Sequence, residues 1–177
     1  MRLVVKKTNN LNKSQIKDIC KLKDIHWKFG LKEQLIWFKK NVFENDLHFI
    51  VYKNKELAGY TLLRLRNYNY IQNKKKNKKL KKYFLFDTHI VKSKYRKTGM
   101  NILLMRKIST KIIKKRTIGF LLCTKSLLNY YKKFDWVLLR KNNVKIYNFK
   151  TRKSCMIFNA KKTITNYKSR KFNFNFN

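Results

Sequence analysis

The chain has 177 residues, of which 44% are hydrophobic and 15% aromatic, so it can bury a sizeable core as one domain. Its 46 Lys and Arg against 8 Asp and Glu give a formal net charge of +38. A surface of this kind favours phosphates, polyanions and anionic lipid as partners, but it names no reaction. The basic residues occur in every segment, which argues against one dedicated nucleic-acid face.

The three cysteines, Cys20, Cys123 and Cys155, are odd in number and far apart. This spacing favours neither a disulfide framework nor a zinc site, and free thiols are typical of a reducing compartment. The three histidines also lack ligand spacing, so we expect no metal. No apolar run approaches the roughly 20 residues of a membrane span. We therefore expect a cytoplasmic protein without a membrane partner, either a monomer or a homodimer.

The first part of the chain changes between strand-like and helix-like patterns. Apolar residues recur at helical spacing after Asn12 until Gly30 ends the pattern, and a second helical stretch follows with Glu33 in its first turn. Two β-rich runs then flank a short polar turn. The expected elements are a strand at 2–6, a helix from 12 toward 27, a helix at 32–41, and a hairpin of strands at 47–52 and 57–66.

The middle and end of the chain contain the clearest helix and strand patterns and also the most basic segments. Residues 69–82 lack apolar periodicity and end in a run of lysines, so we expect an exposed loop there. From Lys161 onward we expect a basic, loose tail. Between them we expect a strand at 83–91, a helix at 100–115, a strand at 118–123, a short helix at 125–133, and closing antiparallel strands at 136–139, 144–149 and 155–159. This order predicts one α/β domain over residues 1–160, with a mixed sheet and helices on both faces.

One strand-turn-helix stands out as a candidate anion site. The apolar strand that ends at Val91 turns through Arg96 to Asn101 into a helix, which places free backbone amides of a helix start beside a full positive charge. Gly99 allows close approach of a ligand or a positive φ. A diphosphate is the ligand that suits such a turn, although a glycine in a basic turn is often only a turn.

Three stretches of the chain, together spanning about residues 3–149, resemble the GNAT (GCN5-related N-acetyltransferase) family. The turn Arg96-Lys97-Thr98-Gly99-Met100-Asn101 is similar to the family's R/Q-x-x-G-x-G/A, with Asn101 in place of the last small residue. The segment from Thr124 to Trp136 is similar to N-x-x-A-x-x-F-Y-x-x-x-G-F, with Tyr131 at the tyrosine position. Gly59 lies in the second hairpin strand, as a glycine does in the family.

The resemblance implies a fold, a cofactor and a reaction. The fold is a mixed, mostly antiparallel sheet of about six to seven strands flanked by four helices. The reaction is transfer of an acetyl group from acetyl-CoA to a primary amine. The residues implied to bind the cofactor are Val91, Arg96, Lys97, Thr98, Gly99, Met100, Asn101 and Thr124.

The chemistry of acyl transfer assigns further roles. The resemblance implies that the N–H of Val91 stabilises the oxyanion and that Tyr131 protonates the departing thiolate. An acceptor amine is mostly ammonium at neutral pH and must lose a proton, and two residues that alternate onto one strand face, His89 and Asp87, are both candidate bases. Each also has a structural alternative: Tyr131 as a packing residue, His89 as a hydrogen-bonded sheet residue, and Asp87 as an anchor for a neighbouring loop.

The sequence leaves the identity of the amine acceptor open. An anionic small molecule, such as an amino sugar or a nucleotide-linked amino sugar, suits the charge and the aromatic residues of the first helices. The resemblance places the acceptor pocket between the first two helices and the third strand, which here offer His26, Trp27, Phe29, Gln34, Trp37 and Tyr60. The alternative is a nucleic-acid- or ribosome-associated basic protein that keeps the GNAT fold without catalysis. The high positive charge is the main observation in favour of this alternative.

Overall fold

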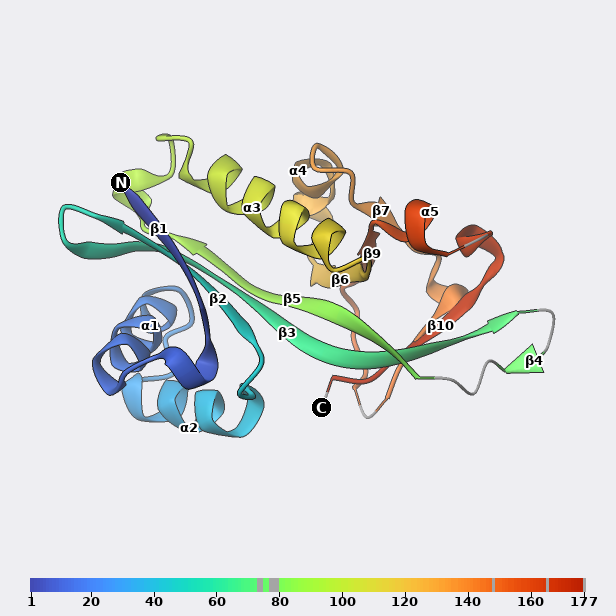
Figure 1. Ribbon diagram of the computed structural model, residues 1–177, viewed down its shortest axis with the longest axis horizontal. Helices are drawn as coiled ribbons and strands as arrows, with labels where there is room; N and C mark the ends of the chain where they lie inside the picture. Colours follow the sequence, from blue (N-terminus) through green and yellow to red (C-terminus); the bar gives the residue numbers. More distant parts are fainter. Residues whose placement is uncertain (73–74, 77–79, 148, 165, 177) are drawn as a thin grey trace. The chain divides into compact units, whose positions relative to one another are not determined.

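The computed structural model describes residues 1–72, 75–76, 80–147, 149–164 and 166–176. The chain forms two compact units, Met1–Arg64 with Asp87–Ile108 and Leu65–Phe86 with Ser109–Asn177. Figure 1 labels β3 (Glu56–Gln72), β5 (Lys81–Val91) and α3 (Met100–Lys114), three elements that have residues in both units. Within the described residues no helix is long and apolar enough to cross a membrane.

The first unit consists of four strands in the order β1-β2-β3-β5 with three helices. β2 pairs antiparallel with both β1 and β3. Besides its parts of β3, β5 and α3, the unit contains β1 (Arg2–Lys7), α1 (Lys13–His26), α2 (Leu31–Asn41) and β2 (Leu47–Lys53).

Local signals in the sequence explain where the first two helices begin. Asn12 caps α1 in a capping box, because its side chain accepts from the Gln15 N–H while the Gln15 side chain accepts from the Asn12 N–H. Gly30 precedes α2 with a φ of +86°, a conformation that disfavours other residues. The predicted helices at 12–27 and 32–41 are confirmed.

The helices of the first unit cover opposite faces of its strands. Apolar residues of α1 and α2, among them Ile19 and Phe38, pack with Tyr60 and Leu62 of β3 and with Ile90 of β5. α3 approaches the other face, where the Gly59 position lies against it. Alternate residues of β3 therefore face different helices.

The second unit continues the strands in the order β3-β5-β6-β9-β7. β5 and β6 are parallel, whereas β9 is antiparallel to both β6 and β7. Besides its parts of β3, β5 and α3, the unit contains β4 (Lys75–Lys76), β6 (Ile118–Cys123), α4 (Leu128–Lys132), β7 (Val137–Leu138), β8 (Val144–Ile146), β9 (Ser154–Phe158), α5 (Ala160–Thr163) and β10 (Lys171–Phe174).

The expectation of an exposed loop over residues 69–82 is wrong for most of its described part. β3 continues to Gln72 and β5 begins at Lys81, while Lys75–Lys76 pairs with β3; residues 73–74 and 77–79 lie outside the described residues. Tyr68 and Tyr70, which are alternate residues of β3, pack in the core. The many lysines of this segment obscured this period-2 strand pattern in the sequence. The Lys81 side chain even reaches the Tyr70 hydroxyl, at 3.3 Å.

The expectation of a loose tail from Lys161 also differs from the structure. β10 pairs antiparallel with β3 and parallel with β8, so the closing strands are not all antiparallel as predicted. Phe172 and Phe174 are fully buried, and the Phe174 ring lies 3.9 Å from the Phe120 ring, centre to centre. The alternation of Phe and Asn at the chain end is a strand pattern, with aromatic rings on the core face.

Candidate functional site

The turn after β5 presents the start of a helix to solvent. Gly99 has a φ of +78°, and its carbonyl accepts the first intrahelical hydrogen bond from Leu103 N–H at 3.0 Å. Gly99 is therefore the N-cap of α3. The amides of Met100, Asn101 and Ile102 are in the first turn, where a helix offers no internal acceptor. Oriented amides and the helix dipole together favour an anion at this point.

A carboxylate holds the turn in place from the start of β3. Glu56 accepts from Lys92 Nζ at 2.8 Å, from Lys94 Nζ at 2.5 Å and from the Tyr95 hydroxyl at 2.5 Å. These three hydrogen bonds, Lys92 first, lower the pKa of Glu56 to about 2. The backbone adds a further link, because Lys92 N–H donates to the Ala58 carbonyl at 2.9 Å. The turn is thus fixed to β3 before any ligand arrives.

The side chains of Arg96, Lys97 and Thr98 in the turn are exposed, and some form hydrogen bonds within the turn. Arg96 and Lys97 are exposed, and Arg96 Nε donates to the Val91 carbonyl at 3.4 Å, which ties the guanidinium to the end of β5. Thr98 donates its hydroxyl proton to the Tyr95 carbonyl at 2.8 Å. A Cβ at Gly99 would meet nothing within 4 Å, so the space in front of the helix start is open. Free amides, two cations and open space fit a pyrophosphate group.

Gly59 sets how closely α3 approaches β3. A Cβ at this position would lie 2.8 Å from Met100 Sδ and 3.4 Å from Leu104 Cδ1. The first turn of α3 therefore packs on β3 in the space left by the missing side chain of residue 59.

Asn101 replaces the small residue of the GNAT pattern, and its side chain faces the sheet. It forms a hydrogen bond with His89. The imidazole also contacts Thr61, whose Oγ1 is 2.8 Å from His89 Nδ1. Burial lowers the pKa of His89 to about 4, although the bond to Asn101 acts in the opposite direction. His89 is therefore neutral at pH 7 and a weak base.

Asp87 lies on the other face of β5 from His89, so the prediction that both share one face is wrong. Asp87 Oδ2 is 2.9 Å from Arg64 Nη1, and the Arg64 guanidinium lies 5.8 Å from the Trp37 ring of α2. His89 instead pairs with Thr61 and with α3. Simple alternation would place residues 87 and 89 together, so β5 departs from regular alternation here.

Lys23 of α1 completes a basic cluster around Asp87 that the sequence analysis missed. Its Nζ lies 3.3 Å from the centre of the Trp37 ring, and the residue is only 4% exposed. Burial lowers the pKa of Lys23 to about 8, with Asp87 opposing that effect. Two cations, Lys23 and Arg64, thus surround one carboxylate on the face covered by α1 and α2. In the sequence, the alternation of Arg64 with Leu63 and Leu65 was the pattern that could have indicated this cluster.

The predicted acceptor-binding residues have different environments. Phe29 is 70% exposed, whereas Gln34 is buried and donates to the Trp27 carbonyl at 2.8 Å. Tyr60 is fully buried, and its hydroxyl is 2.8 Å from Nδ1 of His48, a residue that the sequence analysis did not single out. Thr8 Oγ1 is 2.8 Å from His48 Nε2, and burial lowers the pKa of His48 to about 4. This network is a hydrogen-bonded part of the core.

The two remaining predicted residues belong to the second unit. Tyr131 of α4 is 7% exposed, and its ring stands edge-on to Phe86 at 5.8 Å and to Trp136 at 6.3 Å. Burial raises the pKa of Tyr131 well above that of a free phenol, so it stays protonated at neutral pH. Thr124 follows β6, and its hydroxyl is 2.8 Å from that of Ser126.

In the part of the chain that the structure describes, no group of three or more His, Cys, Asp or Glu residues could hold a metal ion.

Comparison with known proteins gives structural likenesses but no sequence match. No protein family and no curated protein sequence matches the chain. Its structure is similar to an acyl-CoA N-acyltransferase from Pseudomonas aeruginosa, with a TM-score of 0.65 at 12% identity over 89% of this chain and 99% of that one. An acetyltransferase of the GNAT family from Staphylococcus aureus gives a TM-score of 0.61 at 10% identity, over 89% and 98%.

A third similar structure is an aminoglycoside 6'-N-acetyltransferase complexed with coenzyme A, with a TM-score of 0.57 at 10% identity over 87% of this chain and 94% of that one. The mixed, mostly antiparallel sheet and its helices agree with these likenesses, which confirms the predicted fold class. The chain has the fold of the GNAT acetyltransferases.

Proposed function

We propose that this chain is an acyl-CoA-dependent N-acyltransferase that uses acetyl-CoA and a primary amine. The observation that supports it most is the anchored turn after β5, where Gly99 opens the start of α3 beside Arg96 and Lys97. The amides of the first turn of α3 would hold the pyrophosphate, with the two cations beside it. When bound, acetyl-CoA supplies an activated acyl thioester.

Further roles follow from the chemistry of each residue. The Val91 N–H is the proposed donor to the developing oxyanion. Tyr131 is the proposed proton donor, since burial keeps its phenol protonated through a raised pKa. Neither predicted base is free to act: burial lowers the pKa of His89 to about 4, and the Asp87 carboxylate forms an ion pair with Arg64. The acceptor amine therefore reacts in its free form. Its ammonium form first loses a proton to water or to a transient base.

The cluster of Lys23, Arg64 and Asp87 supports an anionic acceptor. Two cations against one carboxylate leave an excess of positive charge on the face that α1 and α2 cover. This excess lowers the pKa of an ammonium group nearby and attracts a carboxylate or phosphate elsewhere on the same molecule. An amino sugar bearing a phosphate has both properties.

Calorimetry with acetyl-CoA at low salt tests the cofactor part of the proposal. We expect saturable binding that weakens at least about tenfold in Arg96→Glu, because a charge-assisted hydrogen bond to phosphate is lost. Lys107→Glu changes the charge equally at an exposed position further along α3 and should leave binding unchanged. Absence of binding, or equal loss in both variants, would contradict the proposal.

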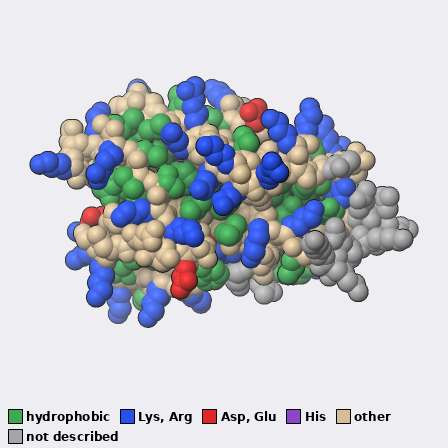
Figure 2. Space-filling model, viewed as in Figure 1, with side chains coloured by type: hydrophobic (Ala, Val, Ile, Leu, Met, Phe, Trp, Pro, Cys, Tyr) green, Lys and Arg blue, Asp and Glu red, His purple; other side chains and the backbone are tan. Residues whose placement is uncertain are grey.

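The nucleic-acid alternative has no comparable site in its favour. Figure 2 shows Lys and Arg side chains scattered over the whole visible face, with few acidic ones between them. A positive charge spread in this way attracts any polyanion and does not require a specific one. Tight RNA binding at physiological salt without acetyl-CoA binding would favour this alternative.

A further inference from the structure

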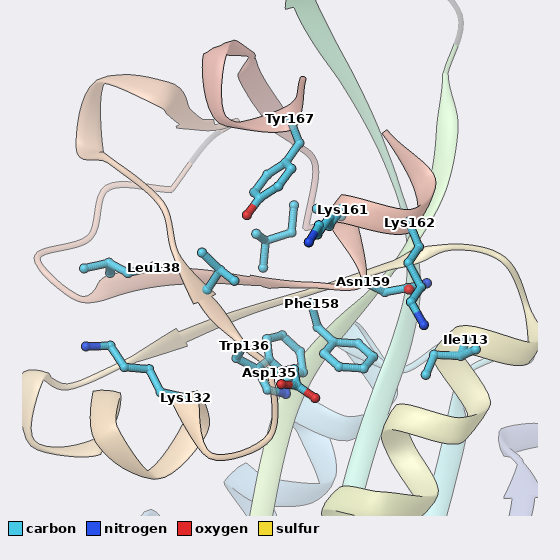
Figure 3. Close-up of a pocket in the computed structure, with 13 residues that line it drawn as sticks. Ile113, Lys132, Asp135, Trp136, Leu138, Phe158, Asn159, Lys161, Lys162 and Tyr167 are labelled. Atoms are coloured by element: carbon cyan, nitrogen blue, oxygen red, sulfur yellow. The ribbon is translucent and has the colours of Figure 1, made fainter. Parts of the chain in front are cut away.

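The second unit contains a cavity of about 680 Å³ that the proposed acyl transfer does not use. Four parts of the chain form its walls: the end of α3, the segment from α4 through β7, the end of β9, and α5 with Tyr167 after it. Figure 3 shows the Tyr167 side chain extending from one side of the cavity, with Trp136 and Phe158 opposite. The volume is in the range of cavities that hold small molecules.

The inner wall of the cavity is apolar. Trp136, Ile157 and Phe158 line it, and all three are buried. At its mouth the edge strand β7 exposes Val137 and Leu138, which are 40% and 45% accessible. An apolar wall that continues into exposed apolar side chains favours the hydrocarbon part of a ligand.

The rim of the cavity is basic. Lys132, Lys161 and Lys162 line it and are exposed, and Asp135 is the one acidic residue in the lining. The rim thus carries an excess of positive charge above an apolar wall.

We propose that this cavity binds an amphiphilic anion, a small molecule with an aliphatic or aromatic body and one carboxylate or phosphate group. The body lies against Trp136, Phe158 and Leu138, and the anionic group lies among the rim lysines. A second copy of this chain is a poor occupant, because each copy has a net charge of +38 and the two would repel. The proposal is independent of the acyltransfer site.

Calorimetry with four ligands that share one eight-carbon chain tests the chemistry. We expect octanoate and octyl phosphate to bind, with affinity falling as salt rises, and octanol and octylamine to bind at least about tenfold more weakly. The stronger of the two anions identifies the head group. Equal binding of octanol or octylamine, or no binding of either anion, overturns the proposal.

Matched variants locate the site. Lys161→Glu/Lys162→Glu should weaken octanoate binding about tenfold or more, whereas Lys141→Glu/Lys150→Glu, an equal change at exposed positions outside the cavity, should not. Leu138→Asp should abolish binding and Leu127→Asp should not, since these leucines are 45% and 44% exposed and only Leu138 lines the cavity.

Two further results separate the proposals and guard against misfolding. Arg96→Glu should bind octanoate as the wild-type does, even where it no longer binds acetyl-CoA. Thermal melting of every variant confirms that it folds. Equal weakening in the control and cavity variants would show nonspecific attraction to a basic protein and would refute the site.

Discussion

At the scale of single residues, two glycines offer a controlled test of the turn. Gly99 and Gly30 have φ values of +78° and +86°, and a Cβ at either would meet nothing within 4 Å. Substitution by Ala therefore costs backbone strain alone, on the order of 1–3 kcal/mol of unfolding free energy in each case. We expect both variants to lose that much stability in denaturant titrations, and only Gly99→Ala to weaken acetyl-CoA binding in calorimetry.

Equal acetyl-CoA affinity in Gly99→Ala and Gly30→Ala would mean that the conformation of residue 99 does not matter to the ligand. It would remove the main support for a pyrophosphate at the start of α3.

Glu56 predicts a dependence of stability on pH. Its pKa is lowered from an ordinary value of 4.5 to about 2, mainly by its hydrogen bond to Lys92. Between these values the unfolded chain binds more protons, so the contribution of Glu56 is complete above pH 4.5 and disappears as pH falls toward 2. We expect melting temperatures of wild-type and Glu56→Gln to differ at pH 6 and to converge near pH 2. A constant difference over that range would refute the prediction.

Tyr131 can be tested without disturbing its packing. Tyr131→Phe keeps the ring against Phe86 and Trp136 and removes only the hydroxyl. If the phenol protonates the departing thiolate, turnover falls about 100-fold or more while acetyl-CoA affinity is unchanged. Tyr130→Phe, the neighbouring substitution, serves as the control. Unchanged turnover in Tyr131→Phe would leave Tyr131 as a packing residue.

The sequence could predict which residues surround the turn but not how they pair. The Arg96-to-Asn101 motif indicates an anion site by its residue types and spacing. That the Asn101 side chain bonds His89, and that Asp87 faces Arg64 on the opposite side, depends on an irregularity in β5 and on tertiary packing. Local patterns contain neither kind of information.

At the scale of elements, Gly59 and Gly119 make a second matched pair. A Cβ at Gly59 would lie 2.8 Å from Met100 Sδ, and one at Gly119 would lie 2.8 Å from Trp136 Cη2 and 2.9 Å from Ile112 Cδ1. Ala at either position should destabilise the fold by about 1–3 kcal/mol through overpacking. Since Met100 begins α3, we expect only Gly59→Ala also to weaken acetyl-CoA binding. The same loss in Gly119→Ala would point to general destabilisation.

Most helices and strands were predictable because their signals are local. The capping box at Asn12, the break at Gly30 and the apolar run at 118–123 each fix an element within a few residues. The extensions of β3 and β5 and the strand β10 were not predicted, because lysines and asparagines dominate their composition. Their order comes from packing in the core, by residues such as Tyr68 and Phe172.

At the scale of the whole molecule, the charge of +38 governs every binding measurement. Anionic ligands will bind to some extent anywhere on such a surface at low salt, and screening with a Debye length of about 8 Å at physiological ionic strength removes most of that attraction. Specific sites differ from this background because they depend on particular residues, so each variant in a binding experiment is compared with a control that changes the charge by the same amount.

The most direct test of the proposed function is thiol release from acetyl-CoA in the presence of amines. A panel of amino-sugar nucleotides, aminoglycosides and basic peptides should contain at least one amine that releases free coenzyme A together with an equal amount of acetylated amine. Arg96→Glu should reduce that rate and Lys107→Glu should not. No amine-dependent release, combined with RNA binding that persists at physiological salt, would contradict the proposal of an acyltransferase.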